Sequence, residues 1–347
     1  MIELIGLTKD ELKQELEKIG EKPFRTKQIW QWLYFHGETN FDNMSNLSKD
    51  LRDKLKQNFT ISRPKIAVEQ ISKDKTHKWL LEFSDKQRVE TVYIPEEDRG
   101  AVCVSSQIGC AVGCKFCNTG TQKITRNLLA GEIISQFMIV KDTYKEWATT
   151  KNRMISNIVV MGMGEPLHNI DNTIKALNIL TDADGFAISK RKITLSTSGI
   201  APNIVPIIKQ TGVKLAISLH APNDKLRSEI MPINKKYPLD TVLKACAEYQ
   251  KLDGSRFITF EYLMLKDFND GIEHAKELVS LMKKYKLGAK FNLINFNPWE
   301  GCNYEPSSKS RITAFAKELE KGGFEAPLRK PRGQDILAAC GQLKSKK

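Results

Sequence analysis

The chain has 347 residues, and 54 lysines and arginines against 41 aspartates and glutamates give it a formal net charge of +13. Apolar residues make up 41% of the sequence, which indicates a globular protein with a large core and excludes a disordered chain. No apolar run approaches the ~18 residues that span a bilayer, and no signal-peptide pattern opens the chain. We therefore expect a soluble, cytoplasmic protein without a membrane partner. The basic surplus favours a polyanionic partner such as nucleic acid, although a lysine-rich solvated surface would give the same charge.

Residues 1–60 are predicted to form a small helical domain. Leu12, Leu16 and Ile19 have the spacing of one helix face, and a second stripe includes Ile29 and Leu33. The period then changes, because residues 61–95 alternate apolar and polar side chains in short runs separated by polar turns. This segment is expected to be a connector of short strands.

Apolar strands alternate with amphipathic helices through residues 96–335, the predicted core, and residues 336–347 form a C-terminal tail. The strands are predicted at 101–105, 156–162, 192–197, 213–219, 257–264 and 289–296. The helices are predicted at 130–146, 170–181, 201–211, 239–252, 272–286 and 307–321. Six such units indicate a parallel α/β sheet with right-handed crossovers. Periodicity does not decide whether that sheet is open or curls into a partial barrel.

Four of the seven cysteines, Cys103, Cys110, Cys114 and Cys117, crowd into fifteen residues, and the last three follow the first predicted strand of the core. In a cytoplasmic chain such clustering favours metal or redox chemistry over structural disulfides. The last three have the spacing CxxxCxxC. A structural zinc site needs four ligands, and no histidine lies near in the sequence to complete it. Three thiolates on an iron–sulfur cubane would instead leave one iron open to a ligand.

Polar residues also end several of the predicted strands. Gly162 and Gly164 would let the backbone approach a ligand, and Glu165 could pair with an ammonium group. Ser196 ends the third strand, Ser218, Leu219 and His220 end the fourth, and Asn297 follows the sixth. Taken alone, His220 reads equally well as a hydrogen-bonded histidine at a strand end.

Longer sequence motifs make the functional interpretation specific. The chain resembles the RlmN/Cfr family of radical S-adenosylmethionine (SAM) methyltransferases, which act on adenosine in ribosomal RNA. The resemblance runs nearly end to end, and these segments carry it: 23–25, 28–30, 105–110, 117–121, 162–166, 231–234 and 338–343. It implies a partial (β/α)6 radical-SAM barrel with a small N-terminal helical accessory domain.

The resemblance also implies residue roles. Cys110, Cys114 and Cys117 would hold a [4Fe–4S] cluster, and SAM would contact Gly164, Glu165, Ser196, Ser218, Leu219, His220 and Asn297. Cys340 would carry the methyl group, Cys103 would resolve the enzyme–RNA adduct through a transient disulfide, and Glu90 would accept a proton. A radical route suits the chemistry, because the C2 and C8 carbons of adenine are too poorly nucleophilic for simple methyl transfer.

Each of these last three roles competes with a plainer interpretation. From spacing alone Cys340 is an ordinary thiol near a terminus, although Arg329, Lys330 and Arg332 could favour its thiolate. Cys103 could be a small core residue. Glu90 could pair with Arg88 or Lys86 at an exposed edge. Cys246 and Cys302 receive no role.

Within the family, Gly164-Glu165-Pro166 and the residues between Cys110 and Cys114 look like the enzymes that methylate C2 rather than C8. The resemblance implies 23S rRNA and the anticodon loop of some tRNAs as substrates, with a flavodoxin or ferredoxin system as electron donor. We expect a monomer. The alternatives are the C8 enzyme, a non-enzymatic zinc-containing RNA-binding protein, and a radical-SAM enzyme acting on a small molecule or peptide.

Overall fold

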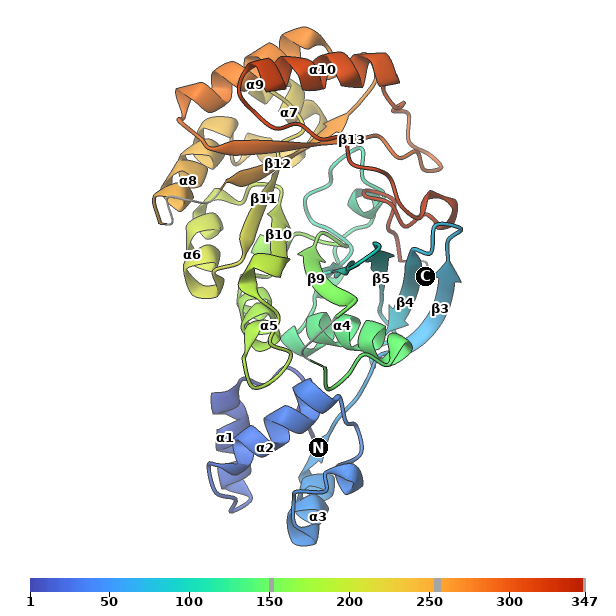
Figure 1. The fold of residues 1–347 in the computed structure, drawn as a ribbon, viewed down its shortest axis with the longest axis vertical. Coiled ribbons are helices and arrows are strands. Elements are labelled where there is room, and N and C mark those ends of the chain that lie inside the picture. The colour runs from blue at the N-terminus through green and yellow to red at the C-terminus, as the bar shows by residue number, and fades with distance from the viewer. Residues whose placement is uncertain (150–152, 253–256, 346–347) are drawn as a thin grey trace.

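A single sheet of nine strands organises the computed structural model, which describes residues 1–149, 153–252 and 257–345 (Figure 1). The order across the sheet is β13-β12-β11-β10-β9-β6-β5-β4-β3. Its parallel strands are β6 (Gly100–Cys103), β9 (Ile155–Val160), β10 (Ile193–Thr197), β11 (Lys214–Ser218), β12 (Ile258–Met264) and β13 (Ala289–Asn295). These are the six predicted strands of the core, so the parallel-sheet prediction is confirmed.

Helices follow the parallel strands and cover the outside of the curved sheet, which gives the partial barrel expected from the resemblance (Figure 1). They are α4 (Ala130–Tyr144), α5 (Ile170–Thr181), α6 (Ala201–Thr211), α8 (Leu239–Leu252), α9 (Ile272–Lys284) and α10 (Lys309–Lys321). A seventh helix, α7 (Asp224–Ile230), precedes α8 and was not predicted, because its seven residues are too short to show a helical period.

The short strands expected in residues 61–95 are part of the main sheet. They are β3 (Lys65–Ile71), β4 (His77–Glu82) and β5 (Arg88–Pro95), and they extend the parallel strands in antiparallel fashion through the pairing of β5 with β6. Residues 61–95, which were predicted to be a connector, are therefore hydrogen-bonded to the barrel as part of its sheet. This continuity places Glu90 of β5 two strands away from β9 in the sheet.

The N-terminal residues form a helical module at one end of the molecule (Figure 1). It contains α1 (Lys9–Lys18), α2 (Arg25–Gln31) and α3 (Lys49–Asn58), with the short strands β1 (Ile2–Glu3) and β2 (Phe59–Thr60) paired in parallel. The predicted faces are the buried ones, and their side chains belong to the same continuous apolar core as the barrel. The module is thus packed onto the barrel rather than tethered to it.

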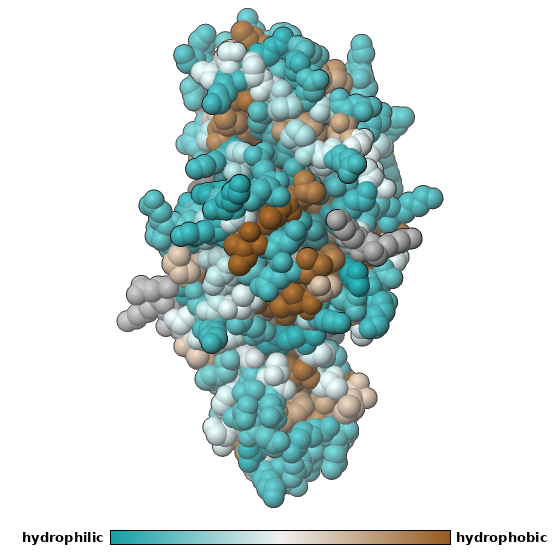
Figure 2. Space-filling model, turned by 90° about the vertical axis from the view of Figure 1, so that its right-hand side faces the viewer, coloured by the Kyte–Doolittle hydropathy of each residue, from teal (hydrophilic) through white to brown (hydrophobic). Residues whose placement is uncertain are grey.

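The outer edge of the sheet is strand β3. Figure 2 shows this side of the molecule, where brown apolar side chains gather within a mostly hydrophilic surface. Strand β3 exposes Ile66, Val68 and Ile71. No helix within the described ranges has the length and apolar character needed to cross a membrane.

Candidate active site

A cavity lies at the carboxyl ends of the parallel strands, where residues 104–129, here called the cluster loop, meet the C-terminal tail. Open α/β folds and barrels place their sites at this end of the strands. Five of the seven residues predicted to contact SAM line the cavity: Gly164, Glu165, Ser196, Ser218 and His220. Leu219 and Asn297 do not line it. The predicted strand ends therefore do converge, although they are up to 56 positions apart in sequence between Gly164 and His220.

The three cysteines Cys110, Cys114 and Cys117 line the same cavity. Burial raises the pKa of Cys110 to about 12 and also raises the pKa of Cys114 and of Cys117. Thiols in such surroundings become thiolates when they bind metal cations. Within the described ranges no three histidine, cysteine or acidic side chains stand close enough to hold a single metal ion. Three thiols spaced around a cavity fit a multi-iron cluster, in which each thiolate binds a different iron.

His220 is far from the cluster cysteines along the chain but lines the same cavity in the fold. Its ring meets the ring of Phe116 edge-on, with 4.9 Å between the centroids. The Nδ1 atom accepts the backbone N–H of Leu263 at 3.1 Å, and burial followed by the charge of Arg227 lowers the His220 pKa to about 3. The ring is therefore neutral with its proton on Nε2, which makes Nε2 a hydrogen-bond donor and not a zinc ligand.

Glu165 connects the ends of two neighbouring strands. One carboxylate oxygen accepts the Thr197 hydroxyl at 2.7 Å and the Leu167 N–H at 3.0 Å, and the other accepts the Ser198 N–H at 2.7 Å. Gly164, with φ +96°, lies so close to Gln107 that a Cβ would stand 2.7 Å from its backbone nitrogen. The glycine thus permits the close approach of the β9 end to the cluster loop, and the carboxylate is oriented by fixed donors.

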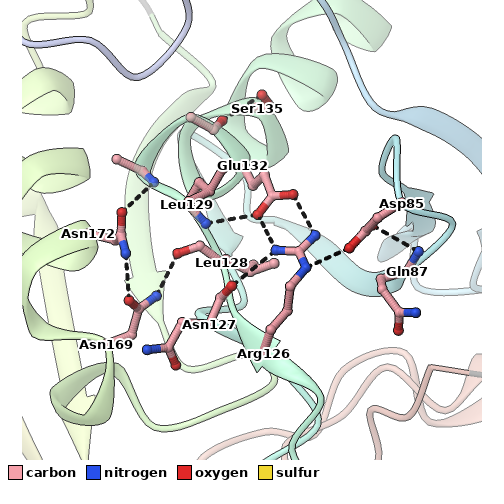
Figure 3. A network of polar contacts seen from close by, with 12 residues as sticks. Asp85, Gln87, Arg126, Asn127, Leu128, Leu129, Glu132, Ser135, Asn169 and Asn172 are labelled. Atoms are coloured by element: carbon pink, nitrogen blue, oxygen red, sulfur yellow. Dashed lines mark hydrogen bonds and ion pairs between the residues drawn. The ribbon is translucent and has the colours of Figure 1, made fainter. Parts of the chain in front are cut away.

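Side chains anchor both ends of the cluster loop, and Figure 3 shows the contacts at its carboxyl end. The Arg126 guanidinium donates two bonds of 2.7 Å to Glu132 in the first turn of α4 and one of 2.6 Å to Asp85 in the turn between β4 and β5. The Asn169 amide donates to the carbonyls of Ser106 and Leu128, near the two ends of the loop. These contacts fix a segment that has little regular structure of its own.

The C-terminal tail is threaded against the cluster loop. The backbone N–H of Asn118 donates to the Gly341 carbonyl at 2.7 Å, and the Thr119 hydroxyl donates to the Leu343 carbonyl at 2.6 Å. From the other side the Asn297 amide donates to the Cys340 carbonyl at 3.2 Å. Asn297 therefore holds the tail, and Cys340 lines the cavity with the three cluster cysteines.

The basic residues of the tail do not lower the pKa of Cys340. Cys340 is exposed as a residue, yet the protein packed around its sulfur and the nearby carboxylate of Glu261 raise the pKa of this thiol, and the guanidinium of Arg329 only partly offsets them. The expectation of a favoured thiolate is wrong, because desolvation outweighs one solvent-facing cation.

Cys103 and Glu90 lie beneath the tail. Cys103 ends β6, where burial, together with the nearby Cys340, raises the pKa of its thiol to about 12. The structure thus brings the two predicted redox partners near each other as free thiols. Glu90 is buried rather than at an exposed edge: one oxygen pairs with Lys78 at 2.8 Å and the other accepts the backbone N–H of Lys344 at 2.8 Å. Arg88 and Lys86 pair with Glu82 instead.

Three charged residues near the site escaped sequence analysis: Lys78, Arg227 and Glu261. Glu261 lines the cavity, accepts the Asn292 amide at 2.8 Å and has its pKa raised by burial. A lone carboxylate inside the apolar run of β12 was the available signal. Lys78 gives a similar signal in β4, whereas Arg227 lies in the unpredicted helix α7. Cys246 is buried in α8, and Cys302 lies in a loop beside the Lys115 carbonyl.

Three thiols above the carboxyl ends of a six-stranded parallel barrel define the radical SAM class of enzymes. The model of the radical SAM superfamily matches residues 104–280, and the model described as "Ribosomal RNA large subunit methyltransferase N-terminal domain" matches residues 2–61. A radical SAM methyltransferase from Sphaerobacter thermophilus has the same fold, with a TM-score of 0.92, 39% identity and 99% coverage of both chains.

Curated relatives narrow the class to a family. Proteins called "Dual-specificity RNA methyltransferase RlmN" from Paramagnetospirillum magneticum and Acidiphilium cryptum are 52% and 51% identical to the chain. Each match covers 99% of this chain, and 75% and 89% of the respective relative. The chain belongs to the RlmN family of radical SAM methyltransferases. As an enzyme of this class it uses a [4Fe–4S] cluster and SAM.

Proposed function

We propose that this chain methylates C2 of an adenosine in 23S rRNA and of an adenosine in the anticodon loop of some tRNAs. Its relatives are named as dual-specificity RNA methyltransferases, and its net charge of +13 suits an RNA partner. The observation that carries the proposal is the position of Cys340, which lies in the cavity of the three cluster cysteines with Cys103 near it.

The residues that line the cavity are proposed to bind the iron–sulfur cluster and SAM. Cys110, Cys114 and Cys117 would hold the cluster, which when bound supplies the electron that cleaves SAM. The Nε2–H of His220 is a donor for SAM, and the glycine at 164 lets the cluster loop pack against the end of β9 beside the cavity. The remaining contacts are proposed for Glu165, Ser196, Ser218, Leu219 and Asn297. Leu219 would contribute backbone atoms, since its side chain is fully buried.

Cys340 and Cys103 have different covalent roles in the proposed reaction. The Cys340 thiol loses its proton and its sulfur takes the methyl group of one SAM, which leaves as the neutral thioether. After the methyl carbon has joined the base, the Cys103 thiolate attacks the Cys340 sulfur and a disulfide forms. The sulfur–carbon bond to the RNA breaks with its electron pair going to the carbon side, which takes up a proton to become the methyl group. An external thiol reductant then restores both thiols.

Glu90 is proposed as the acceptor of the proton that leaves the base. In the structure the backbone N–H of Lys344 occupies one of its oxygens and Lys78 the other. The tail must therefore move away from Glu90 before a proton from RNA can reach the carboxylate. Lys78 would stabilise the ionised form of the acceptor.

The remaining assignments concern the whole enzyme. We propose residues 1–60 as an RNA-binding accessory domain, 61–95 as the strand connector, 96–335 as the radical-SAM core and 336–347 as the tail that carries Cys340. We further propose a cytoplasmic monomer that receives electrons from a flavodoxin or ferredoxin system. Target bases in folded RNA have to leave their stack to reach such a cavity.

Nucleoside mass spectrometry tests the function directly. The anaerobically reconstituted enzyme is incubated with unmodified 23S rRNA, SAM and a reductant. We expect 2-methyladenosine from the wild type and none from Cys340→Ala, because that variant has no sulfur to carry the methyl group. Cys302→Ala is the matched control, since it removes a partly buried cysteine with no assigned role, and it should retain product formation.

The other products discriminate the alternatives. 8-Methyladenosine would replace our proposal by the C8 activity. A colourless protein that contains zinc instead of iron and sulfide would contradict the enzyme assignment. Formation of 5′-deoxyadenosine without any methylated base would keep the radical chemistry and reject RNA as the substrate.

A further inference from the structure

Arg227 is a fully buried arginine behind the wall of the active-site cavity. It lies in α7, and four of its N–H groups are used in hydrogen bonds. Nη2 donates to the carbonyls of Ser198 at 2.6 Å and Ser218 at 3.0 Å, and Nε donates to the carbonyl of Leu219 at 3.0 Å. Nη1 donates to the side-chain oxygen of Asn234 at 2.7 Å.

The three carbonyls come from the ends of two neighbouring strands. Ser198 follows β10, Ser218 ends β11 and Leu219 follows it. Ser198 also donates its N–H to Glu165, so that one hydrogen-bonded chain runs from the end of β9 through β10 to β11. The planar guanidinium fork holds several acceptors at once, which a lysine ammonium on a flexible stem does less well.

All four acceptors of Arg227 are neutral, so its charge has no ion-pair partner among the hydrogen bonds of the described residues. The carboxylate of Asp224 reaches it only through Asn234, which donates to Asp224 at 2.9 Å. Burial accordingly lowers the Arg227 pKa to about 10. A buried charge without a paired countercharge is expensive for a folded protein. Ser198 and Ser218, whose carbonyls Arg227 holds, line the same cavity as Cys114, so Arg227 lies directly behind the space that a cluster bound by Cys114 would occupy.

We propose that Arg227 is the built-in countercharge of the iron–sulfur cluster and the positioning residue that joins the carboxyl ends of β10 and β11. This rests on the proposed function, because it requires Cys114 to be a cluster ligand. A cubane held by three thiolates is negatively charged, and the negative charge grows on reduction. A fixed cation behind one ligand favours the reduced form, since net charge and hydrogen bonding tune the potentials of such clusters.

Two substitutions separate charge from geometry. Arg227→Lys keeps the positive charge and loses the fork, whereas Arg227→Gln keeps two N–H donors and loses the charge. Iron and sulfide per chain are measured after anaerobic reconstitution, and the midpoint potential is measured by redox titration followed by electron paramagnetic resonance. We expect a more negative potential and less iron for R227Q, with R227K close to the wild type in potential. Lys225→Met removes an exposed cation from the same helix and should change neither quantity.

The outcomes decide between the roles. Equal potentials for the wild type, R227K and R227Q, or equal shifts in both variants, would overturn the countercharge role. If R227Q fails to fold, R227K alone decides: a potential clearly displaced from that of the wild type, although the positive charge is kept, would overturn the countercharge role. A wild-type protein that takes up no iron would instead overturn the proposed function itself, so the two failures are distinguishable.

Discussion

At the scale of single residues, the buried ion pair of Lys78 and Glu90 shows how a charge is tolerated inside the sheet. Both side chains are buried, their charged atoms are 2.8 Å apart, and they come from the paired strands β4 and β5. Lys78 also donates to the carbonyl of Leu337, near the start of the tail. The pair therefore ties the sheet to the segment that carries Cys340.

Lys78→Met is expected to lower the free energy of unfolding by about 3–5 kcal/mol, because it removes the cation that pairs with the buried Glu90 carboxylate. Urea unfolding measures the loss. The double variant K78M/E90Q should recover part of it, since the remaining buried groups are then uncharged. Lys86→Met is the control: its side chain is 81% exposed and its ion pair with Glu82 should contribute less than about 1 kcal/mol. Equal losses for K78M and K86M would contradict the interpretation.

At the scale of elements, the C-terminal tail keeps its place through hydrogen bonds rather than regular structure. Gln342 is buried, donates to the Pro298 carbonyl at 2.7 Å and accepts the Ala339 N–H at 3.2 Å. With the contacts to Asn118 and Thr119, these bonds hold Cys340 in the cavity. Since the proposed chemistry requires this segment to move between cofactor, RNA and Cys103, its attachment sets how freely the exposed thiol can move.

Gln342→Ala should loosen the tail, because it leaves the Pro298 carbonyl and the Ala339 N–H unsatisfied. A loss of about 1–1.4 kcal/mol corresponds to a rise of about fivefold to tenfold in the rate at which the backbone amides of residues 339–344 exchange hydrogen with solvent. Mass spectrometry of the tail peptide measures that rate in the metal-free protein. Lys344→Ala, which removes an exposed side chain but keeps the backbone bond to Glu90, should leave it unchanged. An unaltered rate in Q342A would show that other contacts hold the tail.

At the scale of the whole molecule, the N-terminal module and the barrel share one apolar core. The Tyr34 ring lies 5.3 Å from that of Phe186, and Lys9 of α1 pairs with Asp182 and Asp184 after α5. Removing residues 1–60 would expose this shared core, so deletion is a poor test of whether the module binds RNA. Substitutions on its exposed surface are the better test.

Gly131→Ala probes the joint between the two parts. A Cβ at residue 131 in α4 would stand 2.3 Å from the carbonyl oxygen of Ile5, so the N-terminal segment has to move away. We expect a loss of about 1–3 kcal/mol in the free energy of unfolding and faster tryptic cleavage between the module and β3. Ser135→Ala, which removes a hydroxyl bond within the same helix, is the control. Wild-type cleavage in G131A would contradict the tight joint.

Local patterns were sufficient to predict much of this protein. The six strand–helix units follow from hydrophobic period, which depends on neighbours a few residues apart. The cysteine spacing and the sequence motifs of the family predicted the cofactor class. The spacing is informative because a compact loop brings its own ligands together. The neutral role of His220 as a donor, and the partners of Glu90, could not be obtained in this way.

Only the tertiary structure decided which distant segments meet. Cys340 lies 223 positions after Cys117 in the chain, yet both line one cavity, since the tail is held by hydrogen bonds from the cluster loop. The burial that raises the Cys103 pKa, and the cage of neutral acceptors that surrounds Arg227 among the described residues, are properties of close packing between elements. Spacing along a chain carries no record of such packing, because desolvation depends on every segment that folds around a group.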